Sequence, residues 1–297
     1  MTALVTADDL AALEDAVAHA FATGDDRHLK VLGYGEISSV LAWDTARGPV
    51  AVKRLPPFPD AARFDAYAAL VHDYLASLAA RLIAPVRTEL VSRPAPGGGT
   101  IAYLVQPILA AASLAPRVMA AGDEAGAVAL FTRIADAVVG YVDDRHGLDG
   151  QLSNWAVDAE GGLRYLDVST PMLRDAAGAE RLDGDVFMAS LPWALRPVVR
   201  RLLLRDILAK YYDPRGVLLD FLGNLYKERL DRHLPALLEV ASARVTPGFD
   251  LREVRRYYRG DARSWALLQR LRRMDRAWQR GVRRRPYPFL LPGRIDR

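Results

Sequence analysis

The chain contains no cysteine, which excludes disulfide bonds and thiolate metal sites and leaves the redox compartment undetermined. It also lacks any apolar run close to the roughly 18 residues that a membrane-spanning helix needs. Residues 1–23 carry acidic side chains in place of the basic and apolar regions of a secretory signal. These absences predict a soluble cytoplasmic protein. Because 51% of its 297 residues are hydrophobic, the chain can bury a sizeable core.

Negative charge is scarce in one part of the chain. The formal net charge is only +4, but arginines crowd residues 252–285, where the opposing acids are Glu253, Asp261 and Asp275. Such asymmetry suggests an acidic partner, namely a phosphorylated substrate, an anionic membrane or a nucleic acid. A solvated basic helix face explains the pattern equally well.

The hydrophobic pattern divides the chain into a β-rich and an α-rich part. Apolar residues at helical spacing predict helices over 8–22 and 60–80. Short, partly β-branched runs bounded by glycine or polar turns predict five strands, at 29–32, 39–44, 50–55, 86–92 and 101–106. After Pro107 we expect a helix over 123–144, a β-hairpin formed by 155–157 and 163–166, and mostly helix from about residue 191.

Two motifs lie in the β-rich part. The first, Gly33-Tyr34-Gly35-Glu36-Ile37-Ser38-Ser39-Val40, lies between two predicted strands. Its glycines let backbone amides approach a phosphate closely, although two glycines in a hairpin turn are common. The second, Val50-Ala51-Val52-Lys53, closes a strand, so Lys53 either points inward toward phosphate oxygens or faces solvent.

Two further motifs lie in the α-rich part. His146-Gly147-Leu148-Asp149-Gly150-Gln151-Leu152-Ser153-Asn154 follows a predicted helix. An aspartate five residues before an asparagine suits a group that orients a hydroxyl beside a metal ligand. Tyr165-Leu166-Asp167-Val168-Ser169 ends the hairpin, where an aspartate can chelate magnesium or simply cap the strand. The order of all four motifs is harder to obtain by chance than any one of them.

In these motifs the chain resembles the protein-kinase-like superfamily over about residues 28–170. The resemblance implies an α+β, two-lobed protein-kinase-like fold, with an N-lobe at 1–106 and a helical C-lobe at 107–297. It implies catalytic roles for Asp149 and Lys53, magnesium ligation by Asn154 and Asp167, and ATP as cofactor, with GTP left open. The nucleotide-binding residues that it implies are Gly33, Tyr34, Gly35, Ser38, Val40, Ala51, Lys53, Asp73, Gln106 and Ile108.

The chain departs from the family pattern in two places. The predicted helix 60–80 has no glutamate to pair with Lys53, and Asp73 lies nearest the expected position, so either the helix sits closer or the ion pair is absent. Val168 and Ser169 replace the last two residues of Asp-Phe-Gly, and no Ala-Pro-Glu follows. The chain therefore looks more similar to aminoglycoside and choline phosphotransferases, which implies a small-molecule acceptor. The arginine content favours an anionic one.

Three alternatives accompany this hypothesis. One is a nucleotide-binding regulatory module without transfer activity, favoured by the missing glutamate. Another is membrane-surface contact by the basic, amphipathic residues 193–212, for which a C-lobe core helix is the better interpretation. RNA contact by 252–285 has no recognised motif in its favour, and we expect no nucleic-acid partner. The tail 286–292 is predicted to be an extended arm that either packs on the domain or stays loose.

Overall fold

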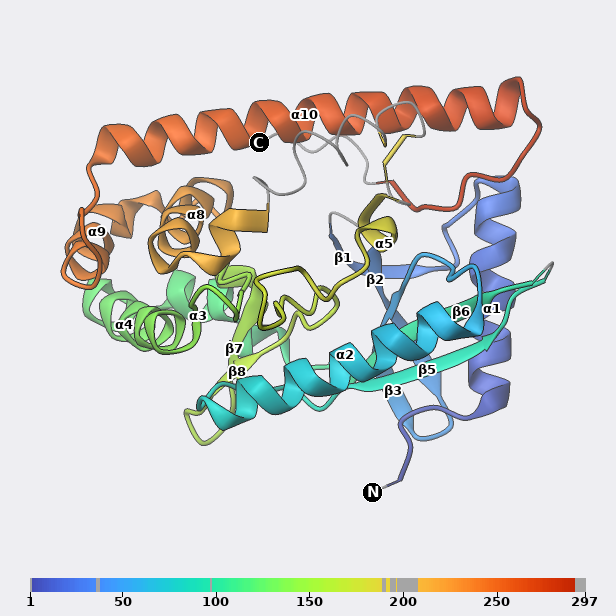
Figure 1. The fold of residues 1–297 in the computed structure, drawn as a ribbon, viewed down its shortest axis with the longest axis horizontal. Helices are drawn as coiled ribbons and strands as arrows, with labels where there is room; N and C mark the ends of the chain where they lie inside the picture. The colour runs from blue at the N-terminus through green and yellow to red at the C-terminus, as the bar shows by residue number, and fades with distance from the viewer. Residues whose placement is uncertain are drawn as a thin grey trace.

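The computed structural model describes residues 2–35, 38–96, 98–188, 191–192, 196 and 208–291. The protein is an α+β fold in which a small antiparallel sheet forms one part and helices dominate the other (Figure 1). The predicted fold class is confirmed at this level.

The sheet has five strands. They are β1 (Lys30–Tyr34), β2 (Ser39–Thr45), β3 (Gly48–Arg54), β5 (Glu89–Pro94) and β6 (Thr100–Pro107). Their order is β1-β2-β3-β6-β5, and every neighbouring pair is antiparallel. Because side chains alternate along a strand, Val50 and Val52 are buried on one face of β3, while Ala51 and Lys53 point to the other.

A helix covers each face of this sheet. Helix α1 (Ala7–Thr23) begins with a capping box between Thr6 and Asp9 and packs its apolar side on the face of Val50 and Val52. Helix α2 (Ala61–Ala80) begins at the N-cap Asp60 and runs along the opposite face (Figure 1). Both helices lie where the apolar periodicity predicts them.

Under α1, a buried ion pair joins the helix to the sheet. Arg54 donates two hydrogen bonds to the Glu14 carboxylate, at 2.9 and 2.8 Å, and the Tyr103 hydroxyl donates to the same carboxylate. Glu14 and Arg54 are both mostly buried. Removing one member of such a pair leaves an uncompensated charge in a poorly solvated place.

We therefore expect Glu14→Ala to lower the free energy of unfolding by about 3 kcal/mol, because Arg54 loses its counter-charge. Urea denaturation followed by circular dichroism measures the change. The neighbouring Asp15 is exposed, so Asp15→Ala is the matched control and should change stability by about 0.5 kcal/mol or less. Equal effects of the two substitutions would contradict a structural role for the Glu14–Arg54 pair.

The α-rich part begins after β6. Its described helices are α3 (Ala115–Ala121), α4 (Glu124–Tyr141), α5 (Gly184–Met188), α8 (Pro214–Lys227), α9 (Leu234–Ser242) and α10 (Leu251–Gly281), with short 3₁₀ turns at Ala111–Ser113, Leu152–Asn154, Lys210–Tyr212 and Asp231–His233. The predicted hairpin is present as β7 (Trp155–Val157) and β8 (Leu163–Tyr165), and the short β4 (Ala84–Pro85) pairs with β8 in parallel. One continuous apolar core joins α2, α4 and α8 around Phe131 and Phe221, whose rings contact each other at a tilt of 39°.

Helix α10 crosses the molecule from α8 toward α1 (Figure 1). Beyond it the chain turns back as an extended arm, and Tyr287 and Leu291 are buried while Leu290 packs against the core under α1. Of the two alternatives for the tail, packing on the domain is therefore confirmed as far as Leu291. The predicted amphipathic stretch 193–212 lies mostly outside the described residues.

Candidate functional site

The site is centred on Lys53, which the pleat of β3 turns toward α2 and the β7–β8 hairpin. Its Nζ donates to both carboxylate oxygens of Asp167, at 3.0 and 2.9 Å, and to the Ser169 hydroxyl oxygen at 2.6 Å. Asp167 and Ser169 lie 114 and 116 positions after Lys53 in the sequence. The expected convergence of Lys53 and Asp167 is therefore present.

Asp167 is held as a charged acceptor. It follows β8, and both the Ser169 backbone N–H and the Ser169 hydroxyl donate to its Oδ1, at 3.0 and 2.7 Å. Burial alone would raise the pKa of Asp167, but the Lys53 ammonium and the Ser169 hydrogen bonds outweigh it and hold this pKa below its usual value. At neutral pH the carboxylate is ionised and available to a cation.

The strand register gathers several other predicted residues on the Lys53 face. Val40 is the cross-strand partner of Lys53, and Gln106 is the partner of Ala51, so these four residues share one face of the sheet. The Gln106 amide also donates to the Leu166 backbone carbonyl at 2.8 Å, which ties the sheet to the residue before Asp167. Gln106 thus holds the strand that carries Lys53 at a fixed distance from the segment that carries Asp167. Ile108 follows β6 and is exposed.

The glycine turn lies directly beside Lys53. The Gly35 N–H donates to the Ser38 carbonyl at 2.9 Å, and a Cβ placed on Gly35 would come within 2.9 Å of that oxygen and 3.9 Å of Lys53 Nζ. A side chain at position 35 would therefore disturb the close approach of Gly35 to the Ser38 carbonyl. Gly33, in contrast, has open space around it, and Tyr34 is exposed. Residues 36 and 37 of the motif lie outside the described part of the chain.

The Asp149–Asn154 loop is joined to Asp167 through backbone carbonyls. The Asn154 amide and the Tyr165 hydroxyl both donate to the Asp149 carbonyl at 3.1 Å, and the Leu166 N–H donates to the Asn154 carbonyl at 2.9 Å. Since the Asn154 nitrogen is used in this bond, its side-chain oxygen is the end left for a cation.

The hydroxyl of Tyr165 interacts electrostatically with both carboxylates of the site, those of Asp149 and Asp167. Burial raises the pKa of this tyrosine well above its usual value, and the charges of Asp149 and Asp167 are among the further causes that raise it. One hydroxyl therefore lies within electrostatic range of both aspartates. His146, in contrast, bonds to Asp143 at 2.7 Å, which supports a structural role for this loop histidine.

Helix α2 does not supply the expected carboxylate. Asp73 forms an ion pair with Arg181 at 2.6 Å, and both side chains are largely exposed. Within the described part of the chain, Lys53 hydrogen-bonds only to Asp167 and Ser169. The predicted role of Asp73 beside Lys53 is therefore corrected, because the helical register turns Asp73 outward. The sequence left two alternatives, a helix that sits closer to Lys53 or no ion pair between Lys53 and α2. Among the described residues, the structure has no such ion pair.

Two side chains that sequence reasoning did not place in the site now belong to it. Ser169 bonds to both members of the Lys53–Asp167 pair, and the buried Tyr67 hydroxyl of α2 donates to the Ser169 carbonyl at 2.8 Å. Tyr67 thus links α2 to the site, a link that the sequence had led us to expect from a carboxylate of this helix near position 73. The position of Ser169, two residues after Asp167, could have indicated a hydrogen bond between them. Tyr67, in contrast, fits the apolar periodicity of the helix, and nothing in the sequence pointed to its hydroxyl.

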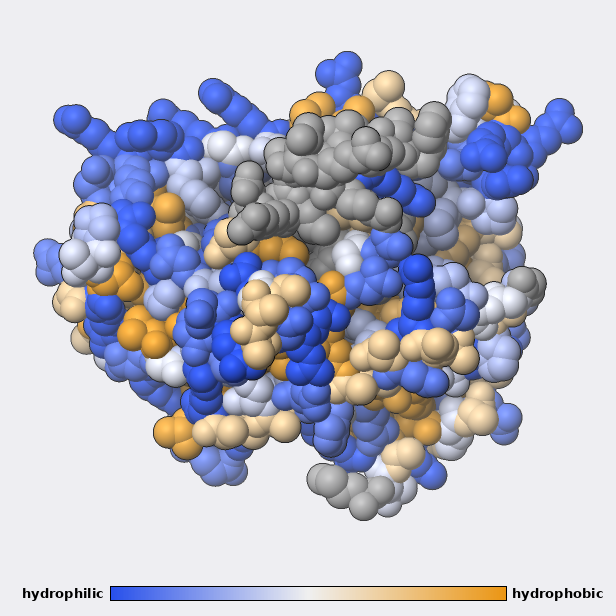
Figure 2. All heavy atoms as spheres, viewed as in Figure 1, coloured by the Kyte–Doolittle hydropathy of each residue, from blue (hydrophilic) through white to orange (hydrophobic). Residues whose placement is uncertain are grey.

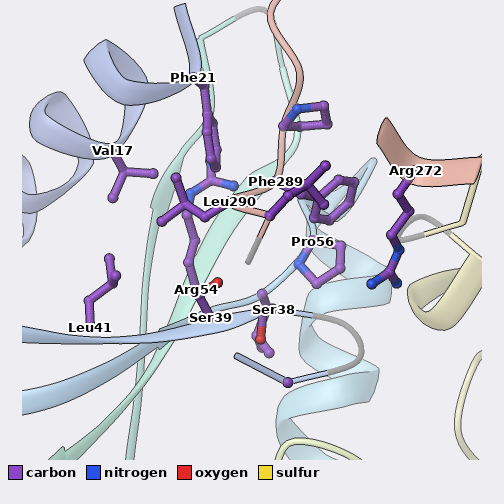
Figure 3. Close-up of a pocket in the computed structure, with 14 residues that line it drawn as sticks. Val17, Phe21, Ser38, Ser39, Leu41, Arg54, Pro56, Arg272, Phe289 and Leu290 are labelled. Atoms are coloured by element: carbon purple, nitrogen blue, oxygen red, sulfur yellow. The ribbon is translucent and has the colours of Figure 1, made fainter. Parts of the chain in front are cut away.

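A pocket opens on the other face of the sheet, beside the glycine turn (Figure 3). It is lined by Val17 and Phe21 of α1, by Ser38 and Arg54, and by the tail residues Phe289 and Leu290. A second pocket lies between α2 and residues 181–185 and includes Tyr67 in its wall. Neither pocket includes Lys53 or Asp167 in its lining, and these two side chains are in direct contact with each other.

The donor set suits a magnesium ion carried in by phosphates. Among the described residues, no cluster of three or more histidine, aspartate or glutamate side chains could hold a metal alone. Mg²⁺ bound with nucleotides uses one or two protein ligands and takes the rest from phosphates and water. Asp167 and the Asn154 oxygen would serve in this way, and the ionised state of Asp167 fits that use.

These features define an α+β protein with a lysine–carboxylate pair set between an antiparallel sheet and a β-hairpin of the helical part. The chain belongs to DUF6206, a family of unknown function whose model matches residues 12–276. That match spans both parts of the fold and all four motifs. Curated proteins give no match to the chain.

Proposed function

We propose that the protein is a phosphotransferase that moves the γ-phosphoryl group of ATP to a hydroxyl of a small, non-protein acceptor. The proposal includes the finer fold, a two-lobed protein-kinase-like arrangement. The observation that carries it is the contact of Lys53 with Asp167, at 2.9 Å, beneath a glycine turn and next to a loop with Asp149 and Asn154. In that superfamily the same four elements position a nucleotide, its metal ion and the acceptor.

The order of the sheet supports the finer fold. The lysine lies on the third strand, and the glycine turn joins the first two. The loop with Asp149 and Asn154 precedes β7, and Asp167 follows β8. Each motif thus occupies the kind of element that the resemblance implies for it.

Each residue has a definite task in this mechanism. Lys53 would exchange its contact with Asp167 for phosphate oxygens, which frees Asp167 to hold magnesium together with Asn154. Magnesium supplies charge neutralisation on the phosphates when it is bound. Asp149 orients the acceptor hydroxyl and takes its proton as the new O–P bond forms and the bond to the leaving ADP oxygen breaks.

The test is a thermal-shift titration of the full chain with Mg-ATP, Mg-GTP and ATP in EDTA. At a nucleotide concentration about a hundred times Kd, binding adds about 2.7 kcal/mol and should raise Tm by about 5 °C. We expect this rise with Mg-ATP and a smaller one in EDTA, followed by ³¹P NMR detection of transfer to a panel of neutral and anionic hydroxyl compounds. No rise with any nucleotide would overturn the proposal.

One observation favours a second candidate, a nucleotide-binding module without transfer activity. Helix α2 contributes no carboxylate to Lys53, since Asp73 is engaged with Arg181. This candidate predicts the same thermal shift but no phosphate release and no transfer to any acceptor. The NMR measurement therefore separates the two functions.

A further inference from the structure

The outward face of α10 carries an apolar stripe that no other described element covers. Leu267, Met274 and Trp278 on the helix, and Val282 just after it, are 58%, 59%, 47% and 61% exposed. At 100° per residue these positions fall within about 80° of one another around the helix axis, and they extend over about 22 Å of its length. The buried residues Val254, Gln269 and Arg272 lie on the opposite side.

Arginines flank this stripe. Seven arginines of α10 are exposed, at positions 252, 255, 256, 259, 263, 270 and 280, and three more follow at 283–285. Within the described residues, none of the seven forms an ion pair with an acidic side chain. Glu253, the acidic residue in the first turn, is paired with Arg215 of α8. Arg270 and Arg280 therefore lie along the apolar stripe, 283–285 follow it, and the other five exposed arginines precede it on the same helix.

Figure 2 shows this combination along the edge where α10 runs. Hydrophobic groups stand there beside strongly hydrophilic ones that project away from the molecule (Figures 1 and 2). No helix in the described part of the chain is long and apolar enough to cross a bilayer. The stripe is thus a surface feature of a helix that packs on the protein by its other side.

We propose that this α10 face docks in the plane of an anionic phospholipid membrane. A helix with an apolar stripe, a tryptophan and flanking arginines lies at the boundary between headgroups and acyl chains, and it binds through apolar burial together with attraction to acidic headgroups. Trp278 has the amphipathic ring that favours this boundary. The proposal is independent of the Lys53 site, so the failure of either one leaves the other standing.

Charge decides between a membrane and the other occupants of such a face. Two copies of this chain packed stripe to stripe would bring their arginines together, and that repulsion disfavours a dimer. A nucleic-acid backbone would satisfy the arginines but would leave the apolar side chains in contact with a hydrated, charged surface. An anionic bilayer matches both components at once.

Vesicle flotation of the full chain tests the proposal. We expect the protein to float with phosphatidylcholine vesicles containing about a third phosphatidylserine, not to float with pure phosphatidylcholine, and to lose binding as salt is raised. Tryptophan emission should shift to the blue on binding, and Trp278→Phe should remove most of that shift. Equal binding to both kinds of vesicle, or to neither, would overturn the proposal.

Two variants make the test specific to α10. Leu267→Ser/Met274→Ser/Trp278→Ser should reduce the bound fraction at least tenfold with little change in Tm, because all three side chains are exposed. Leu82→Ser is the matched control, since Leu82 is 94% exposed but lies after α2, and it should float like the wild type. Unreduced flotation of the triple variant would refute the assignment.

The competing occupants give distinct results. A wild-type dimer in light scattering that the triple variant converts to monomer, without vesicle binding by either protein, would assign the stripe to a second copy. Binding to duplex RNA that survives the triple substitution, again without vesicle binding, would assign the arginines to nucleic acid. Either result would overturn membrane docking.

Discussion

Asp167→Asn is expected to abolish the thermal stabilisation by Mg-ATP, a loss of about 5 °C at saturating nucleotide. The amide keeps the shape of the side chain but removes the charge that holds a divalent cation. It also leaves the mostly buried Lys53 ammonium without its counter-charge, so the free energy of unfolding should fall by about 2 kcal/mol. Thermal shift with and without Mg-ATP, together with urea denaturation, measures both effects.

Asp73→Asn is the matched control for this prediction. Asp73 is also an aspartate in an ion pair, but its partner is Arg181 and the pair is largely exposed. Surface pairs contribute about 0–1 kcal/mol, so this variant should keep both its stability and its full Mg-ATP response. A normal response in Asp167→Asn, or a lost response in Asp73→Asn, would show that the metal ligand has been assigned to the wrong carboxylate.

Asp149→Ala is expected to reduce phosphate transfer by about a hundred- to ten-thousandfold, the usual contribution of a positioned general base. Nucleotide binding should change by less than about threefold, because the ligands that we assign to the nucleotide and magnesium are other residues. Initial rates of ³¹P transfer to the best acceptor give the first quantity, and Mg-ATP titration by thermal shift gives the second.

Asp144→Asn serves as the control for Asp149→Ala. Asp144 lies five positions earlier, is exposed, and uses its backbone carbonyl rather than its side chain to accept a hydrogen bond from Arg174. Its rate of transfer should equal that of the wild type. If Asp149→Ala transfers phosphate at the wild-type rate, Asp149 has no part in the reaction, whatever the nucleotide does.

Sequence reasoning placed the elements well because their signals are local. The helix seen at Ala7–Thr23 was predicted over 8–22 from apolar spacing, and the hairpin of β7 and β8 follows from a glycine turn between two short apolar runs. Lys53 pointed to phosphate chemistry through the strand that precedes it. Each of these inferences needs only the neighbouring residues.

The errors and omissions share one cause, which is that the rotation of a helix against the rest of the chain is a tertiary property. From the sequence, Asp73 was a candidate partner of Lys53, but packing turned it toward Arg181 and brought the Tyr67 hydroxyl to Ser169 instead. A shift of one residue rotates a side chain by about 100°, and local periodicity tolerates that shift.

The arm after α10 illustrates the same limit. Its prolines predicted an extended segment that could not continue the helix, yet they left open whether it touches the protein. The packing of Leu290 under α1 and the burial of Tyr287 depend on the position of the C-terminal end of α10. That position follows from the packing of α10 on α8.

By itself the sequence determined the five strands of the sheet, helices α1, α2 and α4, the β7–β8 hairpin and the four chemical motifs, because strand alternation, helical periodicity and turn chemistry act over a few residues. It did not predict α3 or β4. The motifs led us to expect Lys53 near Asp167, but only the tertiary structure shows that the two are in direct contact across 114 positions. It alone also adds Ser169, 116 positions away, as a partner of Lys53 and turns an apolar stripe of α10 outward. Contacts at such separations depend on how all the intervening elements pack, and the identity of the two partners does not encode that packing.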